Sequence, residues 1–168
     1  MNIIMKLANI KYYSTVNAPG ISTAVFVSGC YHKKHCLGCF NKIAWDGNYG
    51  HELTDELIDK IIEETKPDYI RSLSILGGEP LDAQNTEGVA KIIKRFREVY
   101  GNTKNIWVWT GYVMRDENAE EQQKDIDFEY IPESESLDYI LNNIDVLIDG
   151  PFVQCKYSID LKYRGSSN

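Results

Sequence analysis

The sequence predicts an α/β fold in a single domain, because strand-like and helical segments alternate along its 168 residues. Four segments rich in β-branched and aromatic residues are typical of strands, and they cover residues 23–28, 72–76, 105–110 and 144–149. Strands separated by helices pair in parallel through right-handed crossovers. We therefore expect a mostly parallel sheet, either open and doubly wound or forming part of a barrel.

Three helices are predicted from apolar residues that recur three or four positions apart. The first follows the capping residue Thr54 and carries acids in its first turn, where the helix dipole favours negative charge. Its apolar stripe consists of Leu57, Ile58, Ile61 and Ile62. The second stripe runs from Val89 to Phe96, and a short third stripe runs from Leu137 to Leu141. These helices fill the gaps between the predicted strands.

The charge of the chain is concentrated in one segment. The net charge is −7, and residues 115–135 contain nine acids but only two bases, so the remainder of the chain is neutral. Such a run is typical of a solvated helix and loop. We expect residues 1–168 to form one domain with an acidic insertion near 115–135. Because no basic stripe is available to neutralise phosphates, we expect no nucleic-acid partner.

Cysteine usage and the N-terminal segment indicate a cytoplasmic protein. Three of the four cysteines crowd into one loop of a chain that is large enough to build its own core, which argues against a disulfide framework and for a reducing compartment. The apolar N-terminal stretch is interrupted by Lys6, too soon for a signal peptide or a membrane span. We therefore expect no membrane association.

The cysteine loop is the strongest functional signal. Cys30, Cys36 and Cys39 directly follow the first predicted strand, and their spacing lets three thiolates converge on one inorganic centre. Soft thiolates select zinc, copper(I) or iron–sulfur clusters. Three protein ligands leave one position open for chemistry. The alternative is a zinc site whose fourth ligand is His32 or His35.

The other special sequences also follow predicted strands. Gly77-Gly78-Glu79-Pro80 follows the second strand, Thr110-Gly111-Tyr112 the third, and Asp149 ends the fourth. Parallel strands place these carboxyl ends at one rim, where α/β proteins collect their active sites. Glu79 offers an acceptor for an amino group, and Tyr112 and Asp149 are further candidates for ligand contact.

Several of these segments also carry a family resemblance. They are 26–30, 36–42, 77–81, 106–112, 145–150 and 164–168. Together they resemble the activating proteins of anaerobic (class III) ribonucleoside-triphosphate reductases, which are radical S-adenosylmethionine enzymes. The sequences Trp-Thr-Gly-Tyr and Arg-Gly-Ser-Ser-Asn point to this family in particular. Two features depart from it: five residues rather than three separate Cys30 from Cys36, and Ala18 and Ser22 replace a glycine and an arginine of the family pattern.

The resemblance implies an incomplete radical-SAM (β/α) barrel that binds a 4Fe-4S cluster and S-adenosylmethionine. Cys30, Cys36 and Cys39 would ligate the cluster and so form the catalytic centre. Gly38 and Phe40 would lie against the adenosyl part of S-adenosylmethionine, and Gly78 and Glu79 would steady its methionine end. Cys39, Gly77 and Pro80 complete the set of residues that would bind it.

The resemblance also implies a reaction and two protein partners. Reductive cleavage of S-adenosylmethionine would give a deoxyadenosyl radical that creates a glycyl radical on the large subunit of the anaerobic reductase. The electron would come from a low-potential reductant such as flavodoxin, since cluster potentials span about −700 to +450 mV and this cleavage needs the low end.

Rival functions remain open at this stage. Within the same class, the chain could activate pyruvate formate-lyase, or act on a small molecule as deazaguanine synthases do. From another class, it could be a non-catalytic zinc or iron–sulfur module for electron transfer or assembly. A basic stretch beside the cysteines, which we interpret as a solvated loop or a docking site for the reductase, consists of His32, Lys33, Lys34 and His35. Cys155 matches no motif position and is expected to be a spectator.

Overall fold

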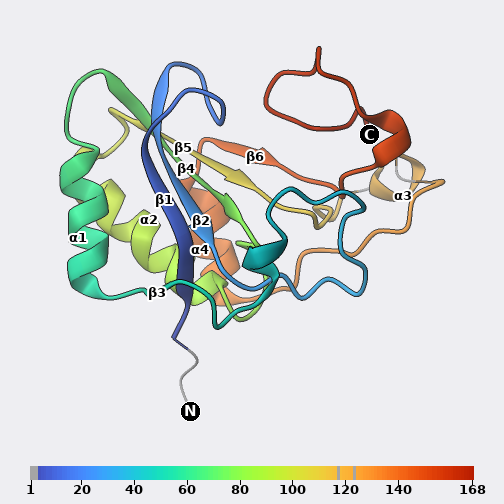
Figure 1. Ribbon diagram of the computed structural model, residues 1–168, viewed down its shortest axis with the longest axis horizontal. Helices are drawn as coiled ribbons and strands as arrows, with labels where there is room; N and C mark the ends of the chain where they lie inside the picture. The colour runs from blue at the N-terminus through green and yellow to red at the C-terminus, as the bar shows by residue number, and fades with distance from the viewer. Residues whose placement is uncertain (1–3, 117, 123) are drawn as a thin grey trace.

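The computed structural model describes residues 4–116, 118–122 and 124–168, and it confirms the predicted α/β fold. Within these residues, six strands form one open sheet in the order β3-β1-β2-β4-β5-β6 (Figure 1). The strands are β1 (Lys6–Ser14), β2 (Ile21–Val27), β3 (His51–Glu52), β4 (Ile70–Gly77), β5 (Asn105–Trp109) and β6 (Val146–Ile148). Strands β2, β4, β5 and β6 run parallel to one another, whereas β1 is antiparallel to both β2 and β3. This mixed, mostly parallel sheet is consistent with part of a barrel.

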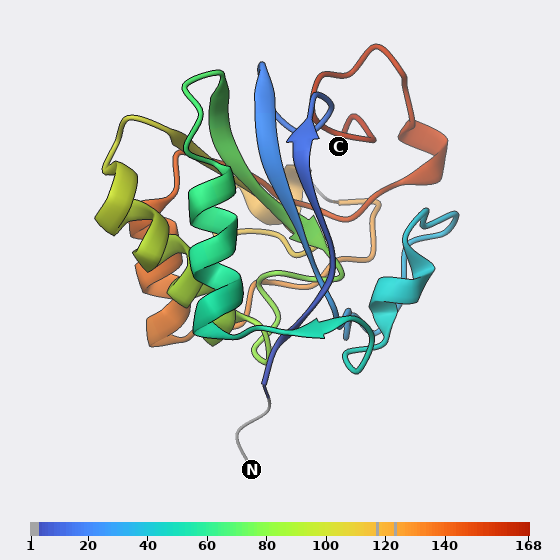
Figure 2. The same ribbon diagram turned by 60° about the vertical axis from the view of Figure 1, so that its left-hand side comes forward.

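The main helices all cover one face of the sheet. These are α1 (Asp55–Glu64), α2 (Thr86–Tyr100) and α4 (Glu135–Asn143), which lie together on one side in Figure 2. Thr54 caps α1 as predicted, because its side chain accepts a hydrogen bond from the backbone N–H of Leu57. A short helix, α3 (Ala119–Gln122), lies in the acidic segment. Among the helices of the described ranges, none is both long and apolar enough to cross a membrane.

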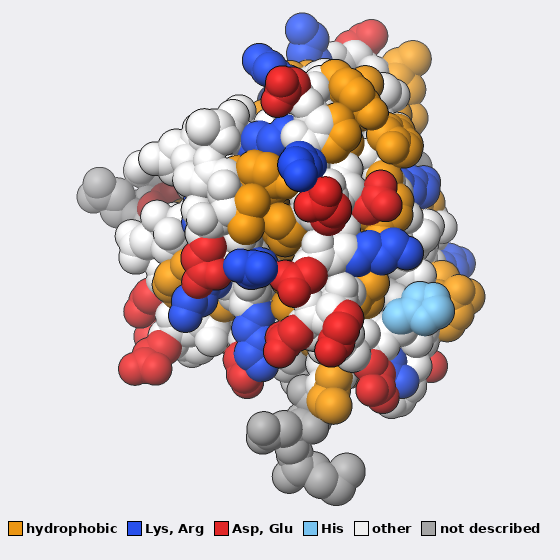
Figure 3. Space-filling model, turned by 90° about the vertical axis from the view of Figure 1, so that its left-hand side faces the viewer, with side chains coloured by type: hydrophobic (Ala, Val, Ile, Leu, Met, Phe, Trp, Pro, Cys, Tyr) orange, Lys and Arg blue, Asp and Glu red, His pale blue; other side chains and the backbone are white. Residues whose placement is uncertain are grey.

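The hydrophobic core lies between the sheet and these helices. In β2, β4 and β5, alternate residues point toward the helices, and their side chains are buried there. The core residues with no exposed area include Val25, Leu73, Ile75, Ile106 and Val108 from the strands and Ile61, Ile92, Phe96 and Ile140 from the helices. Outside this layer, acidic and basic side chains are mixed on the surface (Figure 3). Arg95 on α2, for example, pairs with Asp59 on α1 at 2.8 Å.

The opposite face of the sheet is covered partly by the C-terminal residues 151–168 (Figure 2). The rings of Trp107 and Trp109 lie 5.9 Å apart on this face. Tyr163 contacts Trp107 edge-on, and its backbone carbonyl accepts a hydrogen bond from the indole of Trp109 at 2.7 Å. This C-terminal segment therefore forms one wall above the sheet.

Two strands were absent from the sequence prediction, β1 and β3. In β1, buried and exposed residues alternate, and a register shift interrupts its pairing with β2 on each side of residues 9–11. β3 has only two residues, both exposed. Such segments are defined by their pairing with a neighbouring strand rather than by an apolar run of their own.

Candidate functional site

The cysteine loop and the Gly77–Pro80 turn meet at the carboxyl ends of β2 and β4. These two strands pair in parallel with Val27 opposite Gly77, so both loops leave the sheet at the same level. Two backbone hydrogen bonds join them, from Gly78 N–H to Val27 C=O at 2.8 Å and from Glu79 N–H to Gly29 C=O at 2.7 Å. A Cβ on residue 78 would overlap the Gly29 carbonyl oxygen, so glycine is required for this approach.

Asn85 reinforces the same junction from the start of α2. It occupies the position before the helix, but its side chain makes no capping hydrogen bond. Its buried amide instead donates to the backbone carbonyls of Ser28, Gly29 and Glu79 at 2.9–3.2 Å. The strand that delivers the first cysteine is thereby tied to the glycine turn. Sequence reasoning missed this residue, since an Asn before a helix is ordinarily a cap.

The three cysteines of the loop are free thiols, and each is partly buried. Cys39 donates its backbone N–H to the Cys36 carbonyl at 3.2 Å, which forms a turn around Gly38. Burial raises the pKa of Cys30 to about 12, with a further contribution from the charge of Glu79 and smaller ones from Cys36 and Cys39. Burial also raises the pKa of Cys36. Cys30 and Cys36 are therefore protonated at neutral pH, and metal binding at these two thiols must release their protons.

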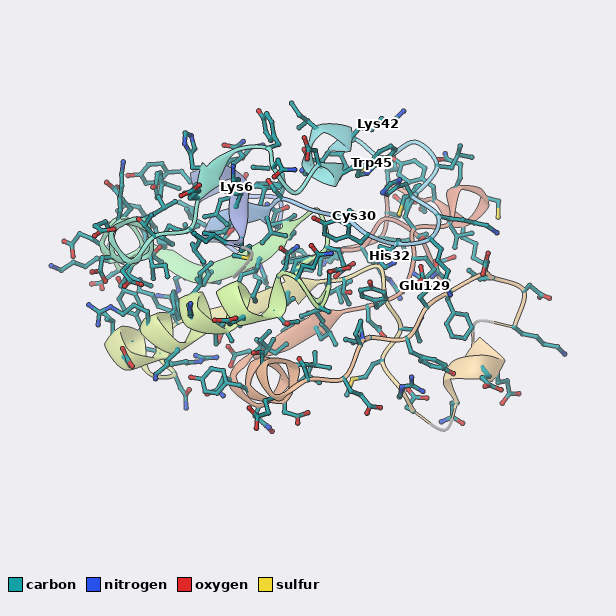
Figure 4. The ribbon with its side chains drawn as sticks, turned by 90° about the horizontal axis from the view of Figure 1, so that it is seen from below. Lys6, Cys30, His32, Lys42, Trp45 and Glu129 are labelled. Carbon is teal, nitrogen blue, oxygen red and sulfur yellow. The ribbon has the colours of Figure 1, made fainter. Side chains whose placement is uncertain are left out.

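His32 lies between two carboxylates at the centre of the rim. Its Nε2 is 2.7 Å from Glu79 Oε2 and its Nδ1 is 3.4 Å from Glu129 Oε1. Figure 4 shows Cys30, His32 and Glu129 close together, with Trp45 of the short helix η1 (Lys42–Trp45) nearby. Burial alone would lower the pKa of His32, but Glu79 and Glu129 outweigh that effect and raise it. A protonated ring donates from both nitrogens.

Glu79 is almost fully buried, and both its oxygens already accept hydrogen bonds. Oε1 accepts from Leu81 N–H at 2.9 Å and from the Thr110 hydroxyl at 2.6 Å. Oε2 accepts from Gly111 N–H at 2.8 Å as well as from His32. This carboxylate therefore joins the ends of β4 and β5 to the cysteine loop, in addition to being a candidate ligand for an amino group.

Two acids of the segment 115–135 contact the cysteine loop. Glu129 accepts a hydrogen bond from the Lys33 backbone N–H at 2.9 Å, and Asp127 pairs with the Lys34 ammonium. The Lys33 side chain is 86% exposed. Sequence analysis interpreted both the acidic run and the basic stretch as solvated, and nothing in either run showed that they would meet. Residues 117 and 123 of the predicted insertion lie outside the described residues.

A cavity of about 620 Å³ opens between the cysteine loop, the ends of β5 and β6, and the C-terminal segment. Residues singled out in the sequence line it, among them Cys36, Phe40, Thr110, Gly111 and Asp149. Phe40 is otherwise highly exposed, and the Asp149 carboxylate accepts a hydrogen bond from Met114 N–H at 2.8 Å. Arg164, Gly165, Ser166 and Asn168 from the C-terminal segment line the cavity too.

Other predicted residues lie at the rim without lining this cavity. Tyr112 is buried, and burial and the charges of Asp82 and Glu79 raise its pKa, so that its hydroxyl donates to Asp82 Oδ2 at 3.1 Å. Pro80 is buried after the turn that Gly77 begins. Cys155 is exposed in the short helix η2 (Gln154–Lys156).

The donor set fits an iron–sulfur cluster better than a single zinc ion. Soft thiolates suit both zinc and iron–sulfur clusters, so a zinc site would need one of the two histidines as its fourth ligand. Both candidate zinc histidines have other partners. His32 faces the two carboxylates, and His35 stacks on Trp45 at 4.0 Å with its Nε2 2.8 Å from the Cys30 carbonyl oxygen. What remains is three soft thiols in one loop, of which Cys36 lines the cavity.

Comparisons with known proteins agree with this chemistry. The family model described as a 4Fe-4S single cluster domain matches residues 16–168, which confirms the predicted cluster domain. The anaerobic ribonucleoside-triphosphate reductase-activating protein of Escherichia coli K12 is 38% identical over 163 residues, covering 94% of this chain and 93% of that protein. Its namesake from Vibrio cholerae is 36% identical over 162 residues, with 94% and 92% covered. The namesake from Enterobacteria phage T4 is 33% identical over 153 residues, with 91% and 84% covered.

Proposed function

Because this chain belongs to the family of anaerobic ribonucleoside-triphosphate reductase-activating proteins, we propose that it activates such a reductase by radical S-adenosylmethionine chemistry. The observation that carries the proposal is the set of three free, partly buried thiols in one loop, of which Cys36 lines the rim cavity. In this proposal Cys30, Cys36 and Cys39 hold the 4Fe-4S cluster and leave one iron open. The bound cluster supplies one electron, which cleaves S-adenosylmethionine into methionine and a deoxyadenosyl radical.

The cavity beside Cys36 is the proposed place for S-adenosylmethionine. Gly38 and Phe40, which flank the last cysteine, would contact its adenosyl end, while the turn Gly77–Pro80 would hold its methionine end. Glu79 supplies a buried negative charge for the cationic amino group. Since Glu79 Oε2 already accepts from His32 and Gly111, the amino group must share that oxygen or replace His32. Tyr112 does not line the cavity, and its hydroxyl instead donates a hydrogen bond to Asp82. Asp149 lines the cavity at the end of β6.

The proposed product is a glycyl radical on the partner reductase. The deoxyadenosyl radical takes one hydrogen atom from a glycine of the large subunit and leaves as deoxyadenosine, so one electron is consumed for each radical formed. The protein must exclude water and other hydrogen donors from the cavity while this occurs. The electron is proposed to come from a low-potential reductant such as flavodoxin.

Anaerobic reconstitution tests this function directly. The chain is loaded with iron and sulfide, reduced with dithionite and mixed with S-adenosylmethionine, and deoxyadenosine and methionine are quantified. We expect both products from the wild type and from Cys155→Ala, whereas Cys36→Ala should give neither, because it removes a ligand while Cys155 is exposed outside the site. A stable cluster without cleavage, or bound zinc, would move the chain to an electron-transfer or assembly module.

The partner is tested in a second step with the same reduced protein. An anaerobic ribonucleoside-triphosphate reductase large subunit and pyruvate formate-lyase are each added, and the glycyl radical is followed by electron paramagnetic resonance. The proposal expects a radical on the reductase. A radical on the lyase alone would refute this choice of partner and leave the radical chemistry intact.

A further inference from the structure

The His32 side chain joins its own loop to three segments of the rim that lie far apart in the sequence. His32 belongs to the five residues between Cys30 and Cys36, and its side chain is only 10% exposed. One ring nitrogen faces Glu79 of the glycine turn, and the other faces Glu129 of the acidic segment, 97 residues away in the chain. Its ring also lies 4.1 Å from that of Tyr112, after β5.

The end of β5 is shaped to receive this ring. A Cβ on residue 111 would lie 2.8 Å from His32 Nε2, closer than real side chains approach, so any other residue there would displace the imidazole from this position. The Gly111 N–H donates to the same Glu79 oxygen that His32 contacts. Gly111 and Tyr112 therefore form a seat for His32, with the Glu79 carboxylate at its base.

Glu129 closes the seat from the outer side. The same oxygen that faces His32 Nδ1 accepts the Lys33 backbone N–H at 2.9 Å, so this carboxylate holds both the ring and the main chain of the loop. A loop of five residues has more conformations to lose than a shorter one. Contacts to its middle residues therefore add to the hydrogen bonds that Cys30 makes with Trp45 and His35 in restricting where the cysteines lie.

We propose that His32 is a positioning residue, which clamps the cysteine loop to the rim between Glu79 and Glu129 and thereby sets the placement of the cluster thiols. The proposal rests on the proposed function only in taking Cys30 and Cys36 as cluster ligands. It also makes the acidic segment part of the site. Removing the clamp frees the middle of the loop without touching any ligand.

The first test needs no cluster. Hydrogen exchange of the apo protein is compared among the wild type, His32→Ala and the neighbouring control Lys33→Ala, whose side chain is exposed. We expect the amides of residues 31–36 to exchange faster in His32→Ala only, with the core amides of β4 and β5 unchanged. Equal exchange in all three proteins would overturn the proposal.

The second test reads the cluster itself in the reconstituted protein. Loss of groups that orient metal ligands costs about 10–100-fold in metal affinity, so iron loss to a chelator should be roughly tenfold or more faster in His32→Ala. The electron paramagnetic resonance spectrum of the reduced cluster, recorded without S-adenosylmethionine, should change as well. His32→Gln keeps a donor toward Glu79 and should recover part of the wild-type behaviour. Wild-type iron loss and an unchanged spectrum in His32→Ala would refute the clamp.

Two alanine substitutions of glutamates in the acidic segment, compared by the same two measurements, test the proposal if His32→Ala does not fold. Glu129→Ala should release the loop in the same direction but less, because the Glu79 contact stays. Glu133→Ala removes the same charge from the same segment at a position 83% exposed, and should behave as wild type. Identical results for the two substitutions would contradict the proposal. If the wild type holds a cluster but cleaves no S-adenosylmethionine, the proposed function fails while these comparisons still decide the role of His32.

Discussion

On the side of the sheet that α1, α2 and α4 cover, the buried cluster consists of apolar side chains. The rim at the carboxyl ends of the strands depends instead on hydrogen bonds to a few polar groups. The apolar layer has many interchangeable contacts, each individually small. The rim has few, and each has a defined direction and partner. A single substitution should therefore lower stability in the first region and alter the geometry of the cysteine loop in the second.

The largest effect on stability is expected from the apolar layer. Phe96 on α2 is fully buried in the core between sheet and helices. Phe96→Ala leaves a cavity there and should lower the free energy of unfolding by about 3–5 kcal/mol, measured by urea denaturation of the apo protein. At a temperature where the variant stays folded, reconstitution should give the wild-type reduced-cluster spectrum. A changed spectrum would break the proposed separation between the two regions.

The exposed loop residue Leu37 provides the opposite case for this measurement. Its side chain is 76% exposed next to Cys36, so Leu37→Ala should change the free energy of unfolding by no more than about 0.5 kcal/mol. A loss comparable to that of Phe96→Ala would mean that the loop is packed against something the present contacts do not include.

The same substitution made once in each region sharpens the comparison at a smaller scale. Tyr100→Phe, in the helix layer, removes a hydrogen bond to the Ile62 carbonyl, which keeps its bond from Thr65 N–H, so the loss should be about 1 kcal/mol. Tyr112→Phe removes the hydroxyl that bonds to Asp82 Oδ2 at a buried carboxylate, so the loss should be about 1.5–3 kcal/mol.

Both variants are measured by urea denaturation under identical conditions. Tyr112→Phe should also loosen the ring that supports His32, and so speed exchange of the loop amides, while Tyr100→Phe leaves them unchanged. Equal free energies of unfolding, together with equal loop exchange, would show that the rim is as redundant as the helix layer.

The elements of the apolar layer were predictable because their periodicity reflects burial. The predicted strand 105–110 corresponds to β5 (Asn105–Trp109), and the predicted stripe from Val89 to Phe96 lies on α2 with its apolar side chains buried. The strand β1, which lies between β3 and β2, was missed because its partners, rather than its own composition, make it a strand. Local patterns thus predicted the main helices and the four parallel strands, but not β1 and β3.

At the rim, spacing placed the three cysteines in one loop and the Gly77–Pro80 turn beside it, but not the contacts between them. The pairing of His32 with Glu79 spans 47 residues, and that of Lys33 with Glu129 spans 96. No local periodicity connects residues that far apart, because a single hydrogen bond leaves no pattern along the chain. Only the tertiary structure shows that the acidic segment approaches the cysteine loop.

The smallest effect is expected where the rim meets solvent, at the ion pair between Lys34 and Asp127. Both side chains are mostly exposed, and surface pairs of this kind add little to stability and weaken further with salt. Lys34→Ala should therefore leave the urea midpoint of the apo protein and its iron-loss rate indistinguishable from wild type at moderate salt. The same substitution also tests a docking role, because reductase binding that weakens in Lys34→Ala at low salt and recovers at high salt would assign this lysine to the partner. If instead iron loss accelerates as in His32→Ala, the Lys34–Asp127 pair also helps to hold the cysteine loop. The ordered part of the rim would then include this exposed ion pair.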